Sequence, residues 1–174
     1  RIAHLIKNGI KPERILAITF TNKAANEMKE RVEKLLTTSD SGHRTSDAPY
    51  VGTFHAWGAR FLRREAIRLG RTAGFSIFDD DDSKRLIKEI CKEKNIPKEK
   101  YNPAAFGAKI SKIKNELLDI DDLRAELSPF SRLAADVYEA YEAALARNNA
   151  FDFDDLLTKV VVALSKDTVL LGNY

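Results

Sequence analysis

Two short segments of the sequence place hydroxyl, aromatic and basic side chains directly after an apolar run. The first is Thr19-Phe20-Thr21-Asn22-Lys23, and the second is Thr53-Phe54-His55. In an open α/β sheet, ligands bind beyond the carboxyl ends of the strands, where helix N-termini present unpaired backbone N–H groups. Hydroxyl and ammonium groups suit phosphate oxygens, and aromatic rings stack on bases. Together, the two segments predict one groove for single-stranded nucleic acid.

Each of these residues also has a purely structural interpretation. Thr21 and Asn22 are good helix N-caps, and Phe20 could lie in the core. A single histidine at a strand end, such as His55, is more often structural than catalytic. The arginines that follow it, Arg60, Arg63, Arg64 and Arg68, could form an ordinary solvated helix face. From the residues alone, the binding and structural interpretations of the first segment are evenly balanced.

The other polar clusters point to helix starts rather than to catalysis. The run Asp79–Asp82 resembles a cation site, but acidic residues at a helix N-terminus cap it and oppose its dipole. The acids in Asp152–Asp155 are explained in the same way, with Phe153 and Leu156 expected to face inward. The three histidines lack zinc-ligand spacing, and Cys91 lies on an apolar stripe typical of core. We therefore predict no catalytic residue, no metal site and no cofactor-binding residue in this chain.

The elements that position the two polar segments are predicted from apolar patterning. Residues 2–7 have helical spacing, and Asn8-Gly9 ends that helix. Residues 15–20 form a continuous apolar run, typical of a strand buried on both faces, and a helix follows from Thr21 or Asn22. After a polar loop over 37–49, residues 50–54 and 75–78 are further strands separated by a helix. Strands alternating with helices predict an α/β sheet.

The pattern changes at residue 79. From there, apolar residues recur at helical spacing in four segments, broken near Asn95-Ile96-Pro97, Asn102-Pro103 and Ser128-Pro129, with no clear strand. Residues 1–78 hold 14 Lys and Arg against 7 Asp and Glu, a net charge of +7. Residues 79–174 hold 15 against 19, a net charge of −4. The coincidence of both boundaries predicts a basic α/β part and an acidic helical part, the basic one suited to a polyanion.

Length and composition exclude several classes of protein. The chain has 174 residues, 44% of them hydrophobic and 32% charged, which suits one domain or two small lobes. It has no apolar stretch long enough for a transmembrane helix, and no signal-peptide pattern at its start. A single cysteine excludes an internal disulfide and favours a cytoplasmic location. Because the chain starts at Arg1 without a methionine, and stops in an apolar segment, we expect it to be part of a longer protein.

Four segments resemble the UvrD/Rep/PcrA-like superfamily 1 DNA helicases, in the right order and over nearly the whole chain. Residues 15–28 (ILAITFTNKAANEM) resemble motif Ia, and residues 51–55 (VGTFH) resemble motif Ib. Residues 75–79 (FSIFD) are similar to the entry into the helical insertion, and residues 152–157 (DFDDLL) to the helix that returns from it. At residues 56–59, the sequence AWGA departs from the family pattern, which leaves the role of Trp57 open.

The resemblance implies a partial RecA-like parallel sheet of the P-loop NTPase type, with an inserted all-helical subdomain. Residues 1–78 correspond to subdomain 1A with motifs Ia and Ib, residues 79–148 to helical subdomain 1B, and residues 149–174 to a helix returning to 1A. The complete protein is then an ATP- and Mg²⁺-dependent 3′–5′ DNA helicase of DNA repair or replication. Its partners are single-stranded DNA and the junction with duplex. The implied nucleic-acid-binding residues are Phe20, Thr21, Asn22, Lys23, Thr53, Phe54, His55, Arg63 and Arg64.

The family's phosphate-binding loop has no counterpart in this sequence, because G-x-x-x-x-G-K-[ST] occurs nowhere in it. The Asp-Glu metal motif is also absent. We therefore expect this chain by itself to bind no ATP or Mg²⁺ and to lack ATPase activity. Two alternatives remain open: a non-enzymatic protein-interaction module, and a subunit of a helicase-nuclease.

Overall fold

The computed structural model describes residues 1–37, 48–97, 99 and 101–174. Its contacts divide the chain into two compact units: residues 1–60 with 167–174, and residues 61–166. We call them the strand unit and the helical unit. Most of the polar segment 37–49, which we expected to be a loop, lies outside the described residues. The subdomain boundaries expected at 78/79 and 148/149 stay predictions.

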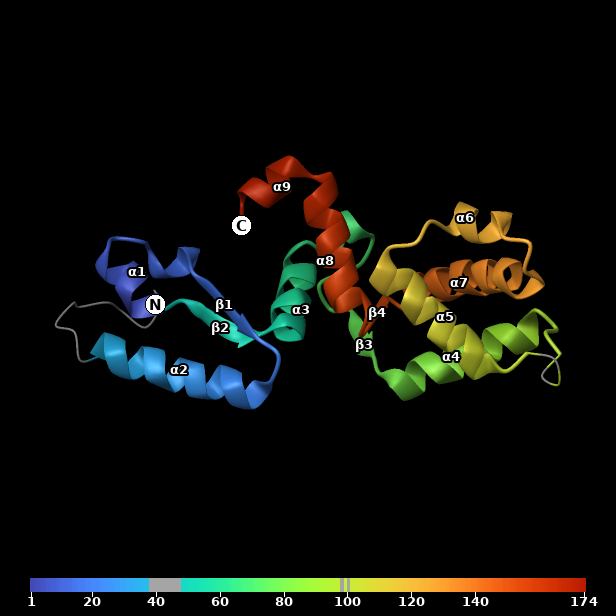
Figure 1. Ribbon diagram of the computed structural model, residues 1–174, viewed down its shortest axis with the longest axis horizontal. Helices are drawn as coiled ribbons and strands as arrows, with labels where there is room; N and C mark the ends of the chain where they lie inside the picture. The colour runs from blue at the N-terminus through green and yellow to red at the C-terminus, as the bar shows by residue number, and fades with distance from the viewer. Residues whose placement is uncertain (38–47, 98, 100) are drawn as a thin grey trace. The chain divides into compact units, whose positions relative to one another are not determined.

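The strand unit is built around two parallel strands joined by a helix (Figure 1). Its elements are α1 (Ile2–Lys7), the 3₁₀ turn η1 (Pro12–Arg14), β1 (Leu16–Thr19), α2 (Asn22–Thr37), β2 (Tyr50–Thr53), the start of α3 (Phe54–Arg64) and α9 (Thr168–Gly172). Strand β1 pairs with β2 in register from Leu16↔Tyr50 to Thr19↔Thr53. Helix α2 packs against β2. The two strand-to-helix transitions predicted from the sequence are confirmed.

The expectation that β1 is buried on both faces is wrong. Leu16 is 44% exposed, and Ala17, Ile18 and Thr19 are only half-buried. The reason is that the sheet containing β1 has two strands in the described part of the chain. A strand at the edge of so small a sheet keeps much of its side-chain surface in solvent.

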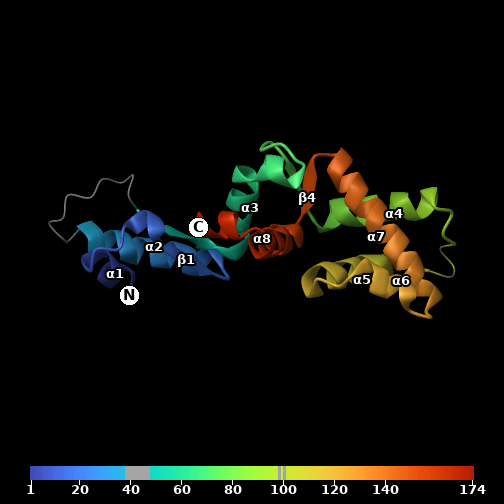
Figure 2. The same cartoon turned by 90° about the horizontal axis from the view of Figure 1, so that it is seen from above.

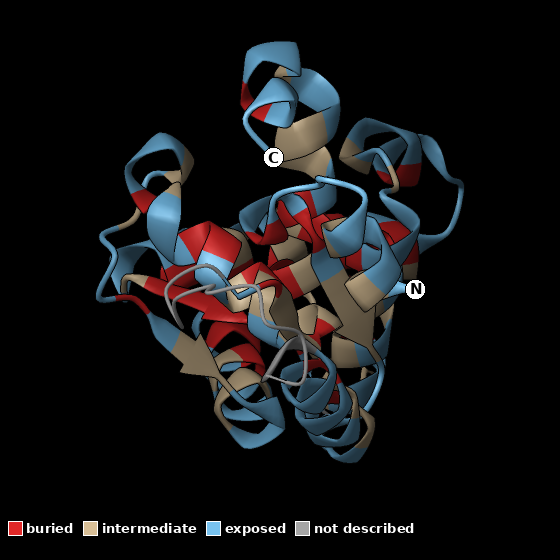
Figure 3. Ribbon diagram, turned by 90° about the vertical axis from the view of Figure 1, so that its left-hand side faces the viewer, coloured by how far each residue is buried: buried red, intermediate tan, exposed pale blue. Residues whose placement is uncertain are grey.

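The helical unit contains the larger apolar core. It continues α3 and holds η3 (Ala66–Leu69), β3 (Ser76–Phe78), α4 (Asp80–Glu93), α5 (Pro103–Glu116), α6 (Ile120–Ala125), α7 (Pro129–Arg147), β4 (Ala150–Asp152) and α8 (Asp155–Lys166). Helices α4, α5 and α7 pack together around Ile90, Phe106, Val137 and Leu145. Figure 2 shows these helices in a second view, and Figure 3 colours the buried residues red. Cys91 belongs to this core, as predicted.

Two local expectations for this unit need correction. We expected no clear strand after residue 79, but residues 150–152 form β4, parallel to β3. A strand of three residues is too short to show a period of two in the sequence. We also expected Phe153 to face inward, but it is 50% exposed, because the preceding Phe151 and Asp152 take the buried positions.

The acidic run at the start of α4 acts as a helix cap. The carboxylate of Asp79 accepts hydrogen bonds from the backbone N–H groups of Asp81 (2.9 Å) and Asp82 (2.8 Å), and the Asp82 carboxylate accepts one from the Asp79 N–H. These hydrogen bonds lower the pKa of Asp79, and the one from the Asp82 N–H has the largest effect. The helix-start interpretation of this run is therefore confirmed.

Candidate nucleic-acid interface

The carboxyl ends of β1 and β2 bring the two polar segments together. Thr19 and Thr53 are register partners at the last position of each strand, and a phenylalanine follows each of them. The ring centroids of Phe20 and Phe54 lie 5.1 Å apart, with an interplanar angle of 39°. Phe20 is 87% exposed, which excludes the core position that we considered for it. An apolar ring left in solvent is available for stacking.

The N-terminus of α2 adds polar groups beside Phe20. Thr21 caps this helix, because its Oγ1 accepts a hydrogen bond from the Ala24 N–H (3.2 Å). Asn22 and Lys23 occupy the first two helical positions and are exposed. N–H groups in the first turn of a helix have no intrahelical acceptor, and the positive end of the helix dipole favours anions there. Phosphate oxygens can therefore bind at this helix end, next to an ammonium group and an aromatic ring.

The second segment is less exposed than the first. Thr53 is buried, and its Oγ1 accepts a hydrogen bond from the Ala56 N–H (3.2 Å), so its hydroxyl caps α3. Phe54 and His55 are half-buried. The contribution of Thr53 to this edge is the placement of α3, whereas Phe54 supports the exposed ring of Phe20.

The two arginines predicted to contact phosphate belong to the helical unit. Arg63 Nη1 donates hydrogen bonds to the carbonyl oxygens of Ala73 (2.8 Å) and Phe75 (3.4 Å), and its guanidinium lies 4.6 Å from the centroid of the Phe75 ring. Arg64 is exposed and lies 3.8 Å from the Glu65 carboxylate. Arg63 therefore anchors the chain between η3 and β3, and a phosphate would have to compete with those contacts.

Aromatic contacts that the sequence did not predict lie near the same strands. The guanidinium of Arg60 lies 5.4 Å from the centroid of the Tyr50 ring, at the start of β2. The ring of Trp57, whose role was open, packs edge-on against Tyr174 with centroids 6.2 Å apart. Trp57 thus joins α3 to the end of the chain within the strand unit.

The helical unit also contains a buried ionic cluster that was not predicted from the sequence. The ammonium of Lys114, 2% exposed, lies 2.7 Å from Asp152 Oδ2, 2.9 Å from Asp155 Oδ1 and 2.7 Å from Glu142 Oε1. The Tyr141 hydroxyl lies 2.9 Å from both Asp152 Oδ2 and Ser83 Oγ. Since a carboxylate only accepts, Tyr141 donates to Asp152 and accepts from Ser83. The cluster joins α5, α7, β4 and α8.

The electrostatics of this cluster follow from burial and mutual charge. Burial alone would lower the pKa of Lys114, but the carboxylates of Asp155, Asp152 and Glu142 outweigh it and raise that pKa. Burial raises the pKa of Asp155 to about 6, against the opposing effect of Lys114. A sequence signal existed, because Lys114 lies on the apolar stripe of Ile110 and Ile113, where a lysine needs a buried partner.

The residues that the structure describes do not fit the Mg²⁺ ion of an ATP–Mg²⁺ site. In the described part of the chain, no group of three or more His, Cys, Asp or Glu side chains is arranged to hold a metal ion. The sequence also lacks a phosphate-binding loop. Among the described helices, none is long and apolar enough to span a membrane.

Comparison with known proteins gives a consistent result over the full length. Residues 1–174 match the family described as UvrD/REP helicase N-terminal domain. The chain is 42% identical over 176 aligned positions to the ATP-dependent DNA helicase PcrA of Staphylococcus aureus (strain Mu50), with 100% of this chain and 23% of that protein covered. The PcrA helicase of Staphylococcus epidermidis is also 42% identical, with the same coverage. The chain thus spans about a quarter of the length of these relatives.

Proposed function

Because this chain belongs to the UvrD/REP helicase N-terminal domain family, we propose that it is the strand-gripping part of an ATP-dependent DNA helicase. In this proposal, the complete protein moves 3′ to 5′ on single-stranded DNA and unwinds duplex at the junction, in DNA repair or replication. The observation that carries the proposal is the exposed Phe20 ring at the shared edge of β1 and β2, beside the N-terminus of α2.

Each group at this edge has a defined role in the proposed binding of single-stranded DNA. The ring of Phe20, backed by Phe54, stacks on a base, which any base sequence permits. The first N–H groups of α2 and the side chains of Asn22 and Lys23 bind the adjacent phosphate. Thr21 fixes the start of α2.

The second turn supports the same strand in this proposal. Thr53 fixes the start of α3, and His55 lies at the first turn of that helix. Arg63 and Arg64 are secondary phosphate contacts, because Arg63 already donates to two backbone carbonyls.

The nucleotide chemistry of the proposed helicase lies outside these 174 residues. ATP and Mg²⁺ would supply the free energy for movement when bound elsewhere in the complete protein. The subdomain division at 78/79 and 148/149 belongs to the same proposal. The 174-residue chain should therefore release no phosphate from ATP, with or without single-stranded DNA. Turnover above a protein-free blank would contradict this part.

Binding of a fluorescein-labelled oligo(dT) to the 174-residue chain, followed by fluorescence anisotropy, tests the grip. Phe20→Ala should weaken binding by about 1–3 kcal/mol, the range for loss of one base–aromatic stack. Ile67→Ala is the matched control, because Ile67 is 88% exposed and lies in the helical unit. Equal affinity of Phe20→Ala and the unmodified chain, both folded by circular dichroism, would refute the proposed edge.

A further inference from the structure

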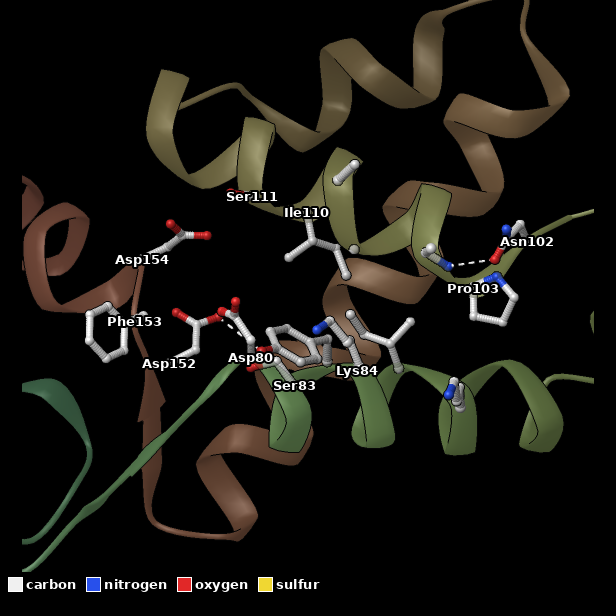
Figure 4. Close-up of a pocket in the computed structure, with 16 residues that line it drawn as sticks. Asp80, Ser83, Lys84, Asn102, Pro103, Ile110, Ser111, Asp152, Phe153 and Asp154 are labelled. Carbon is white, nitrogen blue, oxygen red and sulfur yellow. Dashed lines mark hydrogen bonds between the residues drawn. The ribbon is translucent and has the colours of Figure 1, made fainter.

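A groove of about 590 Å³ runs along the helical unit between α4 and α5. Figure 4 shows Asp152, Phe153 and Asp154 at one end of it, and Asn102 and Pro103 at the other. All its lining residues belong to the helical unit. The groove is therefore lined by none of the residues proposed to hold DNA.

Part of the groove lining is apolar or carries small side chains. Ile87 of α4 and Ile110 of α5 line it, and both belong to the core. On α5, small residues recur at i, i+3, i+4 and i+7, which places them on one helix face: Ala104, Gly107, Ala108 and Ser111. Small residues on one face let a second backbone come close, as they do between packed helices.

The charges along the groove are ordered. Asp80, at the start of α4, and Asp154 lie at the same end of the groove (Figure 4). Lys84 and Lys88 follow Asp80 by one and two turns of α4, so Lys88 is about 12 Å along the helix. Lys84 is paired with Asp81 at 3.2 Å, and Lys88 is exposed. The groove is thus acidic at one end and basic further along.

This order of charges selects among possible occupants. The described carboxylates do not converge on a metal-ion geometry, so a broad, planar cation suits the acidic end better than a metal ion. A guanidinium has that shape and donates hydrogen bonds to several carboxylates. A nucleic-acid backbone would place phosphates against Asp80 and Asp154 and be repelled there.

We propose that this groove binds an amphipathic helix of a partner protein, with an arginine at the Asp80 and Asp154 end and an acidic residue two turns away near Lys88. The intervening apolar side chains of the partner lie on Ile87 and on the small residues of α5. Recognition of this kind uses anchors at i, i+4, i+7 and i+8 of the docked helix. The proposal stands whether or not the strand unit grips DNA.

The probe is a fluorescent alanine-based helical peptide with Arg at position i, Leu at i+4 and i+7, and Glu at i+8. Its binding to the ¹⁵N-labelled 174-residue chain is followed by anisotropy and by amide chemical shifts. We expect shifts at Gly107, Ala108 and Ser111. A peptide with citrulline, the neutral isostere of arginine, should bind about tenfold more weakly, because a charge-assisted hydrogen bond is lost.

Variants of the chain locate the site. Asp154→Asn keeps the oxygen that accepts from Asn115 Nδ2 (2.9 Å) but loses the charge, and should weaken binding by about tenfold. Ala108→Leu fills the groove from an exposed helix position that tolerates leucine, and should abolish binding. Asp122→Asn, an exposed acid in the first turn of α6 outside the groove, should leave the affinity within about twofold, as for other distant surface charges.

Three results would overturn the proposal. The first is absence of shifts at millimolar peptide, and the second is equal binding of the arginine and citrulline peptides. The third is displacement of the peptide by oligo(dT) with shifts of the same amides, which would assign the groove to nucleic acid. If Phe20→Ala bound oligo(dT) as tightly as the unmodified chain, the proposed strand edge would be refuted, but none of these three results would change. The two proposals therefore fail separately.

Discussion

The two units use their polar and aromatic residues in opposite ways. In the strand unit, the Phe20 ring is 87% exposed, and the hydroxyls of Thr21 and Thr53 accept hydrogen bonds from N–H groups three residues away. In the helical unit, the Phe106 ring is fully buried, and Lys114 bonds to carboxylates 38 and 41 residues away. The strand unit thus leaves an aromatic ring exposed and uses its hydroxyls for local helix caps, whereas the helical unit buries its ring and pairs its charge across distant segments.

This difference predicts a separation of phenotypes. A residue that contributes mostly exposed surface adds little to folding, so its loss should affect ligand binding alone. A buried charge without its partner is costly, so its loss should affect stability first. Four substitutions test that separation, in order of decreasing expected effect.

Loss of the buried ammonium should be the most damaging change. Lys114→Met leaves the carboxylates of Asp152 and Asp155 buried without a counter-ion, and should lower the free energy of unfolding by about 3–5 kcal/mol. Urea titration followed by circular dichroism measures it. Lys112→Met on the same helix is the control, because Lys112 is 56% exposed and its pairing with Glu116 at 3.9 Å contributes little. Similar losses in the free energy of unfolding for both variants would contradict the special role of the buried Lys114.

The pH dependence of stability should depend on Asp155. Its pKa is about 6 in the folded chain, above the ordinary value of 3.8, so between these values the folded state binds more protons than the unfolded state. Stability from this group is therefore present at low pH and is lost as pH rises through about 6. Relative to Asp155→Asn, the unmodified chain should lose about 1 kcal/mol between pH 5 and pH 7. Parallel stability curves for the two proteins would count against this assignment.

The cap of α3 should have a local effect no larger than that of Asp155. Thr53→Val keeps the buried volume but removes the hydroxyl that accepts from the Ala56 N–H, and should cost about 1 kcal/mol of stability. Thr53→Ser keeps the cap oxygen and should recover most of that loss. Thermal unfolding of the three proteins measures the order, and a serine variant no better than valine would exclude capping as the cause.

The smallest effect concerns one phosphate contact. Lys23→Gln should leave stability unchanged and reduce the slope of log K against log salt for oligo(dT) by about 0.7, the value for one phosphate on a single strand. Lys29→Gln, further along α2, is the control and should keep the full slope. Anisotropy titrations at several salt concentrations give both slopes. An unchanged slope for Lys23→Gln would remove Lys23 from the proposed grip.

Much of the fold could be predicted because its signals are local. The runs before Phe20 and Phe54 gave both strand-to-helix transitions, and Asp79, Asn102 and Ser128 cap the helices that follow them. Burial could not be predicted in the same way. A continuous apolar run indicated a fully buried β1, but burial depends on which elements cover a strand, and β1 has one paired strand among the described residues.

The candidate site shows the same limit. Residues 19–23 and 53–55 were identified by type and position, because a strand end and a helix start are fixed by neighbours in the chain. Their mutual placement required the parallel register of Thr19 and Thr53, which are 34 positions apart. The sequence also suggested phosphate binding by Arg63, but only the packed structure shows its donors engaged by Ala73 and Phe75.

The sequence by itself therefore determined the strand ends, the helix caps, the division of charge and the family to which these motifs belong. Tertiary structure alone decided that Phe20 is exposed, that β3 pairs with β4, and that Lys114 meets Asp152 and Asp155 in the core. The physical reason is how far apart in the sequence the interacting residues lie. Hydrogen bonds within a turn are set by adjacent residues, whereas burial and buried charge pairing depend on which distant segments the packing brings together.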